Sequence, residues 1–447
     1  MNLTRAFRIK PGEVIALAGG GGKTTTMFRL ADELASAGLR VLTTTTTRLF
    51  TSQVQLAPVR VEFDPASQTI ADILPAVEAA LAAHSQVFIS RPIEPASSKV
   101  TGLPPAIIDA LAQHVDVIIN EADGARKHPF KAPAGHEPVI PASTTLVVPV
   151  VGLDVLGEPL DGDSTHRPEL VSRLTGLPLG APITEETVAA VLTHPQGGLQ
   201  YVPNYARLVP LLNKAETPGR LDSARQLAAK LLTCERIDSV AIGSVQAAAN
   251  PVLEVHGRAA AIILAAGGST RYGSPKQLAR WDEQTFIERV ADVALASSAR
   301  PVVAVLGAEV ERCRAALGRR PVQVVVNEHW AEGQSTSLRA GLAALPVNIN
   351  AAVFLLVDQP GISSDVGDAL IEHYRYTLAP VVWPEFEGRR GNPVLFDRAL
   401  FSELNQVRGD TGGRPVLLAY QAQAGRVAVS NPAVLQDVDR AEGRLLH

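Results

Sequence analysis

The chain alternates short apolar runs with longer amphipathic stretches, a pattern that predicts an α/β protein. Runs of Val, Ile, Leu and Ala without interrupting polar residues are typical of parallel strands that are buried on both faces of a sheet. In the first half, the expected strands are 14–18, 40–44, 86–90, 116–120, 145–151, 207–212 and 238–242. In the second half, they are 260–264, 301–306, 322–326, 352–357 and 379–383, with shorter ones at 393–396 and 426–429.

The pattern repeats itself once, which predicts two successive domains. Each half begins with an apolar strand that runs into a glycine-rich turn, first at 14–26 and again at 261–273. Between the halves, the stretch Gln246–Gly257 is made of small residues and contains a proline. Such a composition favours a linker, so we place the join there. The expected domains are 1–250 and 258–447.

Composition narrows the class of protein. A chain of 447 residues with 46% hydrophobic and 19% charged residues is expected to fold into more than one compact domain. The net charge of -4 without a basic block argues against a nucleic acid partner. There is no apolar run of about 20 residues and no apolar signal segment at the start, so we expect no membrane partner and a cytoplasmic location. The two cysteines, Cys234 and Cys313, are too few for a disulfide framework.

The most informative stretch of the second half is AIILAAGGSTRYGSPKQL at 261–278. Its strand ends in a turn of small residues, whose backbone N–H groups can approach a phosphate closely. Arginine and lysine side chains that follow the turn can neutralise a polyphosphate. The predicted nucleotide-binding residues of this turn are Ala265, Ala266, Gly267, Gly268, Ser269 and Gly273, and the predicted catalytic cations are Arg271 and Lys276.

The order of strand, glycine turn, Arg, Gly and Lys resembles the nucleotidyltransferases, and within them the molybdenum cofactor cytidylyltransferases. The block VVNEHWAEGQSTSLRAGL at 325–342 is similar to a motif of that family, which implies nucleotide-binding roles for Asn327, Gly333 and Ser337. The buried strand VFLLVDQP ends in Asp358, which we expect to be catalytic and to bind a metal ion. The resemblance implies a Rossmann-like nucleotidyltransferase sheet for this half.

The acceptor side of the site is predicted from two further segments. EGRRGNPVLF resembles a family segment that faces the acceptor, and RGDTGGRP resembles a loop that grips a phosphate. Near the end of the chain, LQDVDRAEG is similar to a metal-binding ending, which adds Asp437 and Asp439 as metal ligands. Asn392 stands where the family has His, so the identity of the acceptor is less secure than the reaction type. The implied acceptor-binding residues are Arg390, Gly391, Asn392, Pro393, Asp410 and Arg414.

These residues imply the transfer of CMP from CTP, with Mg²⁺, to the terminal phosphate of molybdopterin, with pyrophosphate as the leaving group. Such a step needs alignment and charge neutralisation rather than covalent help. Two alternatives stay open. One is a nucleotidyltransferase that uses GTP or acts on a sugar or alcohol phosphate. The other is a chaperone that carries the cofactor to an apo molybdenum hydroxylase.

The first half carries LAGGGGKTTT at 17–26, which resembles a P-loop. Backbone amides of the glycines would wrap the phosphates, the lysine would reach the outer ones, and Thr24 would hold magnesium. Leu17 stands where the standard spacing needs glycine, so the match is partial. A P-loop NTPase-like parallel sheet is expected here. Its predicted nucleotide-binding residues are Gly19, Gly20, Gly21, Gly22, Lys23, Thr24 and Thr25.

Two later strand ends complete this predicted site for ATP or GTP. The strand 116–120 ends in carboxylates, of which we prefer Asp123 as the metal or water contact, with Glu121 as the alternative. The strand 207–212 ends in an Asn-Lys-x-Glu motif of the kind that reads a purine base. Its Asn213, Lys214 and Glu216 are therefore predicted to contact the base. A glutamate replaces the usual aspartate, which leaves the preference for guanine open.

Two polar segments of the first half have more than one interpretation. The threonine run 43–47 either holds phosphate through its hydroxyl groups or is a β-branched strand end. The loop residues His128, Lys131, His136 and Glu137, with Arg126 and Lys127, could bind an anionic cofactor. A metal site on the two histidines is the alternative.

Residues 1–245 as a whole resemble the YqeC-type accessory proteins associated with selenium-dependent molybdenum hydroxylases. The resemblance rests on GGGGKTTT, TTTTTRLF and EADGARKHPFKAPAGHEPVIP, and it continues through VVGLDVLGEPL and HRPE. It implies a nucleotide-dependent maturation factor, with an apo hydroxylase as a possible partner. The sequence therefore predicts a bifunctional maturation enzyme.

Overall fold

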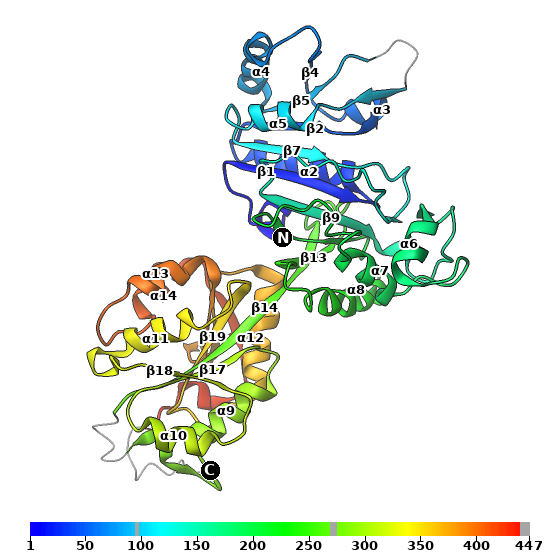
Figure 1. The fold of residues 1–447 in the computed structure, drawn as a ribbon. Coiled ribbons are helices and arrows are strands. Elements are labelled where there is room, and N and C mark those ends of the chain that lie inside the picture. The colour runs from blue at the N-terminus through cyan, green and yellow to red at the C-terminus, as the bar shows by residue number, and fades with distance from the viewer. Residues whose placement is uncertain (94–97, 269–274, 439–447) are drawn as a thin grey trace. The chain divides into compact units, whose positions relative to one another are not determined.

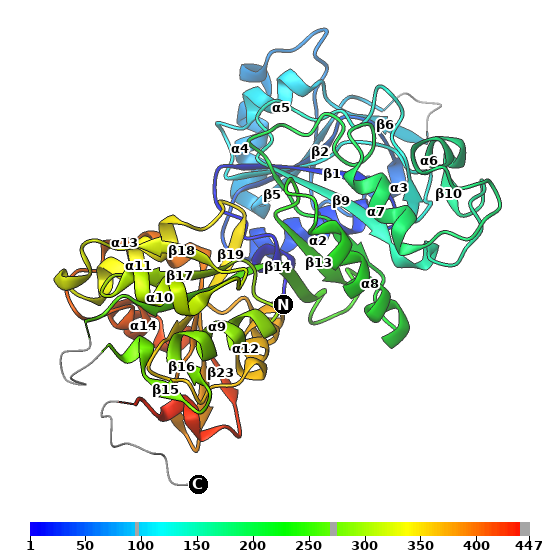
Figure 2. The same ribbon diagram turned by 60° about the horizontal axis from the view of Figure 1, so that its bottom comes forward.

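The computed structural model describes residues 1–93, 98–268 and 275–438. It divides into two compact units, Met1–His256 and Gly257–His447, each with its own sheet (Figures 1 and 2). Four predicted site residues lie outside the described residues, namely Ser269, Arg271, Gly273 and Asp439. In the described residues, no helix combines the length and the apolar character needed to cross a membrane.

The first unit is built on a parallel sheet with the strand order β4-β5-β2-β7-β1-β9-β12-β13. The short strand β11 pairs with the same edge of β9 as β12, nearer to the start of β9. The strands are β1 (Glu13–Gly19), β2 (Val41–Thr45), β4 (Arg60–Glu62), β5 (Gln86–Ser90), β7 (Val117–Glu121), β9 (Leu146–Gly152), β11 (Arg207–Leu208), β12 (Leu211–Asn213) and β13 (Ser239–Gly243). Two small ribbons flank this sheet, formed by β3 (Arg48–Phe50) with β6 (Lys99–Thr101) and by β8 (Phe130–Lys131) with β10 (Thr165–His166).

Helices cover both faces of this sheet (Figure 1). Phe28 of α2 contacts Phe88 of β5, with ring centroids 6.2 Å apart. The neighbouring Val87 and Ile89 belong to the core under α4 and α5, so they point to the opposite face because side chains alternate along a strand. The helices are α1 (Leu3–Ala6), α2 (Lys23–Ser36), α3 (Thr51–Val54), α4 (Ile70–His84), α5 (Pro105–Leu111), α6 (Pro168–Thr175), α7 (Glu185–Thr193) and α8 (Pro218–Leu231).

The second unit has a mixed sheet with the order β18-β17-β14-β19-β22-β20-β23, in which β22 runs against its neighbours. Its strands are β14 (Val252–Ala265), β17 (Val302–Leu306), β18 (Gln323–Val326), β19 (Ile349–Leu356), β20 (Val381–Phe386), β21 (Arg389–Arg390), β22 (Val394–Asp397) and β23 (Gly425–Ala428), with a hairpin of β15 (Arg280–Trp281) and β16 (Gln284–Thr285). Its helices are α9 (Phe286–Ala296), α10 (Val310–Leu317), α11 (Gln334–Ala343), α12 (Ser364–Thr377), α13 (Phe401–Gln406) and α14 (Arg414–Ala419).

The predicted α/β class with parallel-rich sheets is confirmed, and every expected strand has a counterpart. One detail was wrong. The expected strand 207–212 is broken into β11 and β12 because Pro210 has no N–H group for the ladder. The units divide between His256 and Gly257, inside the stretch where the join was expected, and β14 runs through this point from Val252 to Ala265.

Candidate functional site

The glycine loop of the first unit is packed tightly between β1 and α2. Gly19 and Gly21 have φ values of +88° and +78°, and a Cβ atom on either would lie within 2.4 Å of backbone atoms near the end of β9. The N–H groups of Gly19, Gly20 and Gly21 donate to Asp123, Val150 and His128. These three amides are therefore not free to wrap phosphates, as the sequence had suggested. Of the predicted cradle, Gly22 and the first turn of α2 remain as candidates for phosphate contacts.

Behind this loop lies a buried group of opposite charges. The Nζ of Lys23 lies 3.2 Å from Asp123 and 3.7 Å from Glu121, and it donates to the carbonyl of Gly19 at 2.6 Å. Burial alone would lower the pKa of Lys23, but Asp123 and Glu121 raise it above its usual value. Lys23 is thus held as a cation inside the protein, before any ligand is considered.

The structure reverses the order of the two metal candidates. Asp123 is buried and is held by two lysines and the Gly19 amide. Glu121 instead lines the open cavity beside α2 and accepts a hydrogen bond of 2.8 Å from the Oγ1 of Thr24. Burial raises the pKa of Glu121. The prediction of Asp123 as the metal contact is therefore not supported, and the alternative, Glu121, lies beside Thr24 in the cavity.

The charge network continues away from the loop. Lys131 contacts both Asp123, at 3.1 Å, and Glu137, at 2.7 Å. Arg167 also binds Glu137, at 2.5 Å. Burial alone would raise the pKa of Glu137, but the hydrogen bonds from Arg167 and Lys131 lower it to about 2. Lys131 and Glu137, which were predicted to contact an anionic cofactor, are thus mutually satisfied.

One cavity of about 990 Å³ joins most of the predicted residues of this unit. A volume near the upper end of the roughly 300–1,000 Å³ range of ligand pockets can accept a nucleotide. Gly19 and Gly20 do not line it. The residues that were predicted from the sequence and do line it are Gly21, Gly22, Lys23, Thr24, Thr25, Arg126, Lys127, His128, Glu137, Asn213, Lys214 and Glu216.

The predicted base-reading residues have partners within the protein. Asn213 donates to the carbonyl of Gly21 at 2.7 Å and accepts from the N–H of Val245 at 2.9 Å. Its amide therefore fastens the glycine loop to the segment after β13, and it keeps one further N–H hydrogen for a ligand. Lys214 pairs with Asp154 at 2.5 Å, and the carboxylate of the exposed Glu216 accepts a hydrogen bond from Ser244.

The ambiguous segments of the first unit are resolved in part. The hydroxyl groups of Thr44, Thr45 and Thr46 donate to backbone carbonyls, which supports a strand end rather than a phosphate site. Both ring nitrogens of His128 face carbonyl oxygens, at 3.0 and 2.9 Å, and His136 is exposed. A metal site on this pair is therefore not supported, and no cluster of metal-binding side chains is found among the described residues.

In the second unit, the glycine turn is held by a glutamine. The side chain of Gln277 is buried, and its Nε2 donates to the carbonyls of Ala265, at 2.9 Å, and Gly267, at 2.6 Å. On the other side, the indole of Trp330 packs against the turn so closely that a Cβ on Gly268 would lie 2.8 Å from it. The turn is thus fixed by contacts that do not involve a ligand.

The other predicted nucleotide-binding residues position a helix. Asn327 is buried and donates to the hydroxyls of Thr336 and Ser337 at 2.8 and 3.0 Å, which fixes the first turn of α11. Gly333 has a φ of +117°, and a Cβ there would lie 2.6 Å from the backbone of Gly409. Both residues therefore fix the start of α11, and a nucleotide contact by either stays a prediction.

A lysine and two aspartates meet at the carboxyl edge of this sheet. β14 and β19 are parallel neighbours, with Leu264 paired to Leu356, so the segments that follow them emerge together. Lys276 lies 3.3 Å from Asp358, and neither side chain is fully buried. Asp437 accepts a hydrogen bond from Gln359 at 2.7 Å, and the next residue donates its N–H to the carbonyl of Asp358. Two predicted metal ligands thus lie on adjoining segments.

Four of the predicted acceptor residues line one cavity of about 390 Å³, namely Arg390, Asn392, Asp410 and Arg414. Apolar side chains line it as well, among them Phe354 and Phe396, whose rings meet edge to face at 5.7 Å. Burial and the charge of Arg414 lower the pKa of Arg390. Neither arginine forms an ion pair within the described part of the chain, so the cavity offers two cations to an anionic ligand.

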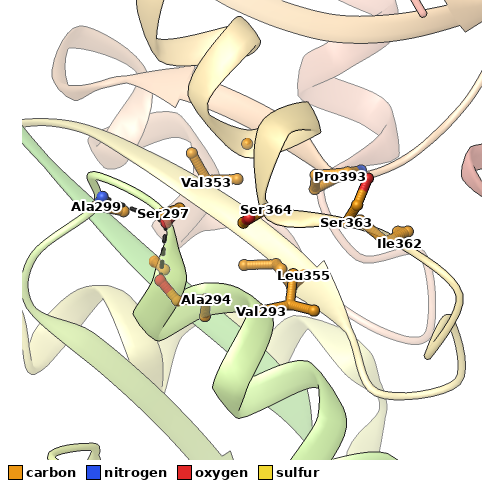
Figure 3. A pocket seen from close by; sticks show the side chains of 12 residues that line it. Val293, Ala294, Ser297, Ala299, Val353, Leu355, Ile362, Ser363, Ser364 and Pro393 are labelled. Carbon is orange, nitrogen blue, oxygen red and sulfur yellow. Dashed lines mark hydrogen bonds between the residues drawn. The ribbon is translucent and has the colours of Figure 1, made fainter. Parts of the chain in front are cut away.

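The remaining two acceptor candidates lie elsewhere. Gly391 packs against Val434, where a Cβ would lie 2.5 Å from a carbonyl oxygen. Pro393 borders a different cavity, between α9, α12 and β19, whose lining includes Val353, Leu355 and Ser297 (Figure 3). That cavity holds about 10 Å³, enough for a single water at most. Direct acceptor contacts by Gly391 and Pro393 are therefore not supported.

Sequence reasoning missed two glutamines. Gln53 of α3 donates to the Oγ1 of Thr24 at 3.1 Å and lines the cavity of the first unit. Gln277 holds the turn of the second unit. Glutamine has no spacing rule of its own, and the only signal was the position of Gln277 directly after the predicted catalytic lysine.

Comparison with known families agrees with this division of the chain. The model of the YqeC protein family matches residues 15–169, and that of the MobA-like NTP transferase domain matches residues 261–424. The chain is 37% identical over 201 residues to "Uncharacterized protein YqeC" of Escherichia coli (strain K12), which is 45% of this chain and 75% of the relative.

Several further relatives match the second unit. One is "Nicotine blue oxidoreductase" of Paenarthrobacter nicotinovorans, 32% identical over 188 residues that make up 40% of this chain and 92% of the relative. Another is a "Probable molybdenum cofactor guanylyltransferase" of Bacillus anthracis, 27% identical over 187 residues, or 42% of this chain and 78% of the relative.

Proposed function

Because this chain belongs to the YqeC family through its first unit and carries a MobA-like NTP transferase domain in its second, we propose that it is a bifunctional maturation enzyme for the molybdenum cofactor. In this proposal, the second unit, with its nucleotidyltransferase domain, transfers a nucleotide from a nucleoside triphosphate to molybdopterin. The first unit binds ATP or GTP for an associated step.

The observation that carries the proposal is the meeting of Lys276 and Asp358, 3.3 Å apart, beside a rigid glycine turn. Ligand sites of open α/β sheets form at the carboxyl ends of their strands, where these residues lie. A cavity of the same unit is lined by Arg390 and Arg414, which form no ion pair with the residues that the structure describes, and it suits an acceptor that ends in a phosphate. The rings of Phe354 and Phe396 in its wall suit the ring system of such an acceptor.

Each residue has a defined task in this proposal. Arg271 and Lys276 neutralise the pyrophosphate that leaves, and the turn formed by Ala265, Ala266, Gly267, Gly268, Ser269 and Gly273 holds the triphosphate. Arg390 and Arg414 hold the acceptor phosphate in line with the α-phosphorus, and Asn392 and Asp410 contact the rest of the acceptor. Alignment and charge account for most of the rate in such transfers.

The carboxylates of Asp358 and Asp437 fit Mg²⁺, since oxygen ligands on adjoining segments are what this ion prefers. Asp439 is the further candidate. Bound there, Mg²⁺ would supply positive charge to the phosphates. In the first unit, Thr24 and Glu121 offer oxygen ligands that fit Mg²⁺ in the same way.

We propose CTP as the nucleotide, on the basis of the Ala-Ala-Gly turn. GTP is the alternative, and one relative of the second unit is named a guanylyltransferase. An apo molybdenum hydroxylase is the proposed protein partner, and the protein is proposed to act in the cytoplasm. If neither nucleotide reacted, a sugar or alcohol phosphate acceptor or a cofactor-carrying chaperone would replace this proposal.

The test is to incubate the full chain with Mg²⁺, molybdenum-loaded molybdopterin and CTP or GTP labelled at the α-phosphate. Label on the pterin and an equal amount of pyrophosphate are expected with CTP. If only GTP labels the pterin, the proposed donor changes from CTP to GTP and the proposed reaction stands. If neither CTP nor GTP labels the pterin and the protein converts nicotine blue instead, a redox function is favoured. One relative of the second unit is named for such a function.

A further inference from the structure

The cavity of the first unit has positive side chains that the proposed nucleotide does not use. Arg48 of β3, Lys99 of β6, and Arg126 and Lys127 of the loop after β7 all line it. We call these four residues the lip cations. They come from segments other than the glycine loop, and strands β3 and β6 pair with each other to hold two of them.

Three of these cations have no acidic partner among the residues that the structure describes. Arg48, Arg126 and Lys127 form no ion pair with any of those residues. The ammonium groups of Lys99 and Lys127 lie 4.6 and 5.4 Å from the centre of the same ring, that of Phe50, which attracts both through cation–π contacts. The positive charges of Arg48, Arg126 and Lys127 are therefore available to an anionic ligand.

The backbone supports the same interpretation. Arg126 and Lys127 are consecutive and have φ values of 48° and 70°, a region that L residues rarely adopt. Arg167 and Lys214, at 64° and 67°, line the same cavity. Left-handed residues cost free energy and tend to persist where function requires them. Near the lip, burial and the charges of Arg167, Lys131 and Arg126 lower the pKa of His166 to about 4.

We propose that the lip cations bind the phosphate or pyrophosphate group of a second small ligand, next to the nucleotide. This inference rests on the proposed function only in taking a nucleotide as the neighbouring ligand. The volume of about 990 Å³ leaves room for two ligands in one cavity. A position beside the glycine loop, within reach of the proposed nucleotide, favours a small phosphorylated molecule over an acidic peptide. The first unit would then act on two substrates and would not be a simple NTPase.

The test is a calorimetric titration of inorganic pyrophosphate into the full chain loaded with Mg²⁺ and a non-hydrolysable ATP or GTP analogue. The chain carries Lys276→Ala, which weakens the pyrophosphate site of the second unit. We expect binding that the additional pair Arg126→Gln and Lys127→Gln weakens at least tenfold, without changing the affinity for the analogue. Arg173→Gln, an exposed arginine outside the cavity, serves as the matched control and should leave binding unchanged.

Two results would overturn the lip site, namely no pyrophosphate binding to the loaded chain, or binding that survives both glutamine substitutions. If the analogue does not bind but pyrophosphate does, and the binding depends on Arg126 and Lys127, the lip site stands and the proposed nucleotide site fails. The two proposals can therefore be separated in one experiment.

Discussion

The two glycine turns of this chain are made rigid in different ways. In the first unit, the loop is backed by a buried network in which Lys23 and Lys131 balance Asp123, Glu121 and Glu137. In the second unit, the turn is held by the neutral side chain of Gln277, and the partly exposed ion pair of Lys276 and Asp358 lies beside it. The first turn therefore depends on buried charges, whereas the second is held by neutral hydrogen bonds.

This difference separates stability from catalysis. Removing one member of a buried ion network leaves an uncompensated charge in the interior, so the fold itself suffers. Removing one member of a partly exposed pair costs the fold little, so the effect falls on the ligand. Removing one charged side chain should thus destabilise the first unit, whereas in the second unit it should lower activity without unfolding the protein.

The largest effect is expected for Asp123→Ala, which removes the buried carboxylate that Lys23 and Lys131 share and leaves Lys23 with Glu121 and Lys131 with Glu137. The first unit should lose about 3–5 kcal/mol of its free energy of unfolding. All three tryptophans, Trp281, Trp330 and Trp383, lie in the second unit. In a denaturant titration, part of the circular dichroism signal should therefore be lost at a lower denaturant concentration than in the wild type. The midpoint of the tryptophan fluorescence transition should not change.

The control for that variant is Asp222→Ala, which removes an exposed partner of Arg225. It should change the stability by less than about 1 kcal/mol. Equal losses for the two variants would show that the network of the first unit is not a stabilising feature, and the contrast between the turns would disappear.

In the second unit, Lys276→Ala and Asp358→Ala should each lower nucleotidyl transfer by about 10²–10³-fold, because each removes a preorganised charge from the reacting phosphates. The fluorescence unfolding transition should not move. Single-turnover assays with labelled nucleotide measure the rate, and Arg312→Ala, at an exposed ion pair, is the control. Turnover near that of the wild type would remove both residues from the mechanism.

A smaller effect is expected where a neutral contact fastens the first loop. Asn213→Ala removes the hydrogen bonds that join the side chain to Gly21 and Val245. The loss should weaken the free energy of nucleotide binding by about 1.4 kcal/mol, which corresponds to a roughly tenfold fall in affinity. Equilibrium binding of a fluorescent nucleotide measures the change, with the exposed Asn204→Ala as the control. Unchanged affinity would mean that the loop keeps its shape without this amide.

The smallest effect is a dependence on pH. In the folded first unit, the pKa of His166 is lowered to about 4 from an ordinary value of 6.5, so the unfolded chain binds the proton more readily. The first unit should therefore lose stability as the pH falls from about 6.5 to about 4. Glu137, whose pKa is about 2, adds a further loss below pH 4.5. Thermal melts of His166→Gln should show a flatter profile between pH 6.5 and 4.

Much of the fold could be predicted because buried parallel strands have an unmistakable apolar pattern. Their carboxyl ends also placed Asp358 and the glycine loop at the edge of a sheet. The sequence could not show which polar groups satisfy one another after folding. Asp123 is followed by Arg126, Lys127 and Lys131, and only the fold shows that Lys131, together with the Gly19 amide, lies against it. Likewise, the amides of the glycine loop are engaged by oxygens from distant segments.

The central claim is that the two turns serve two different nucleotides, and only the second carries out the transfer. The most direct measurement compares CMP transfer to molybdopterin by full-length Asp358→Ala and Thr24→Val, the latter of which removes the hydroxyl beside Glu121 with little change in volume. The account predicts that Asp358→Ala abolishes transfer, while Thr24→Val retains the wild-type rate and loses nucleotide binding in the first unit. Loss of transfer in Thr24→Val, or its survival in Asp358→Ala, would contradict the account.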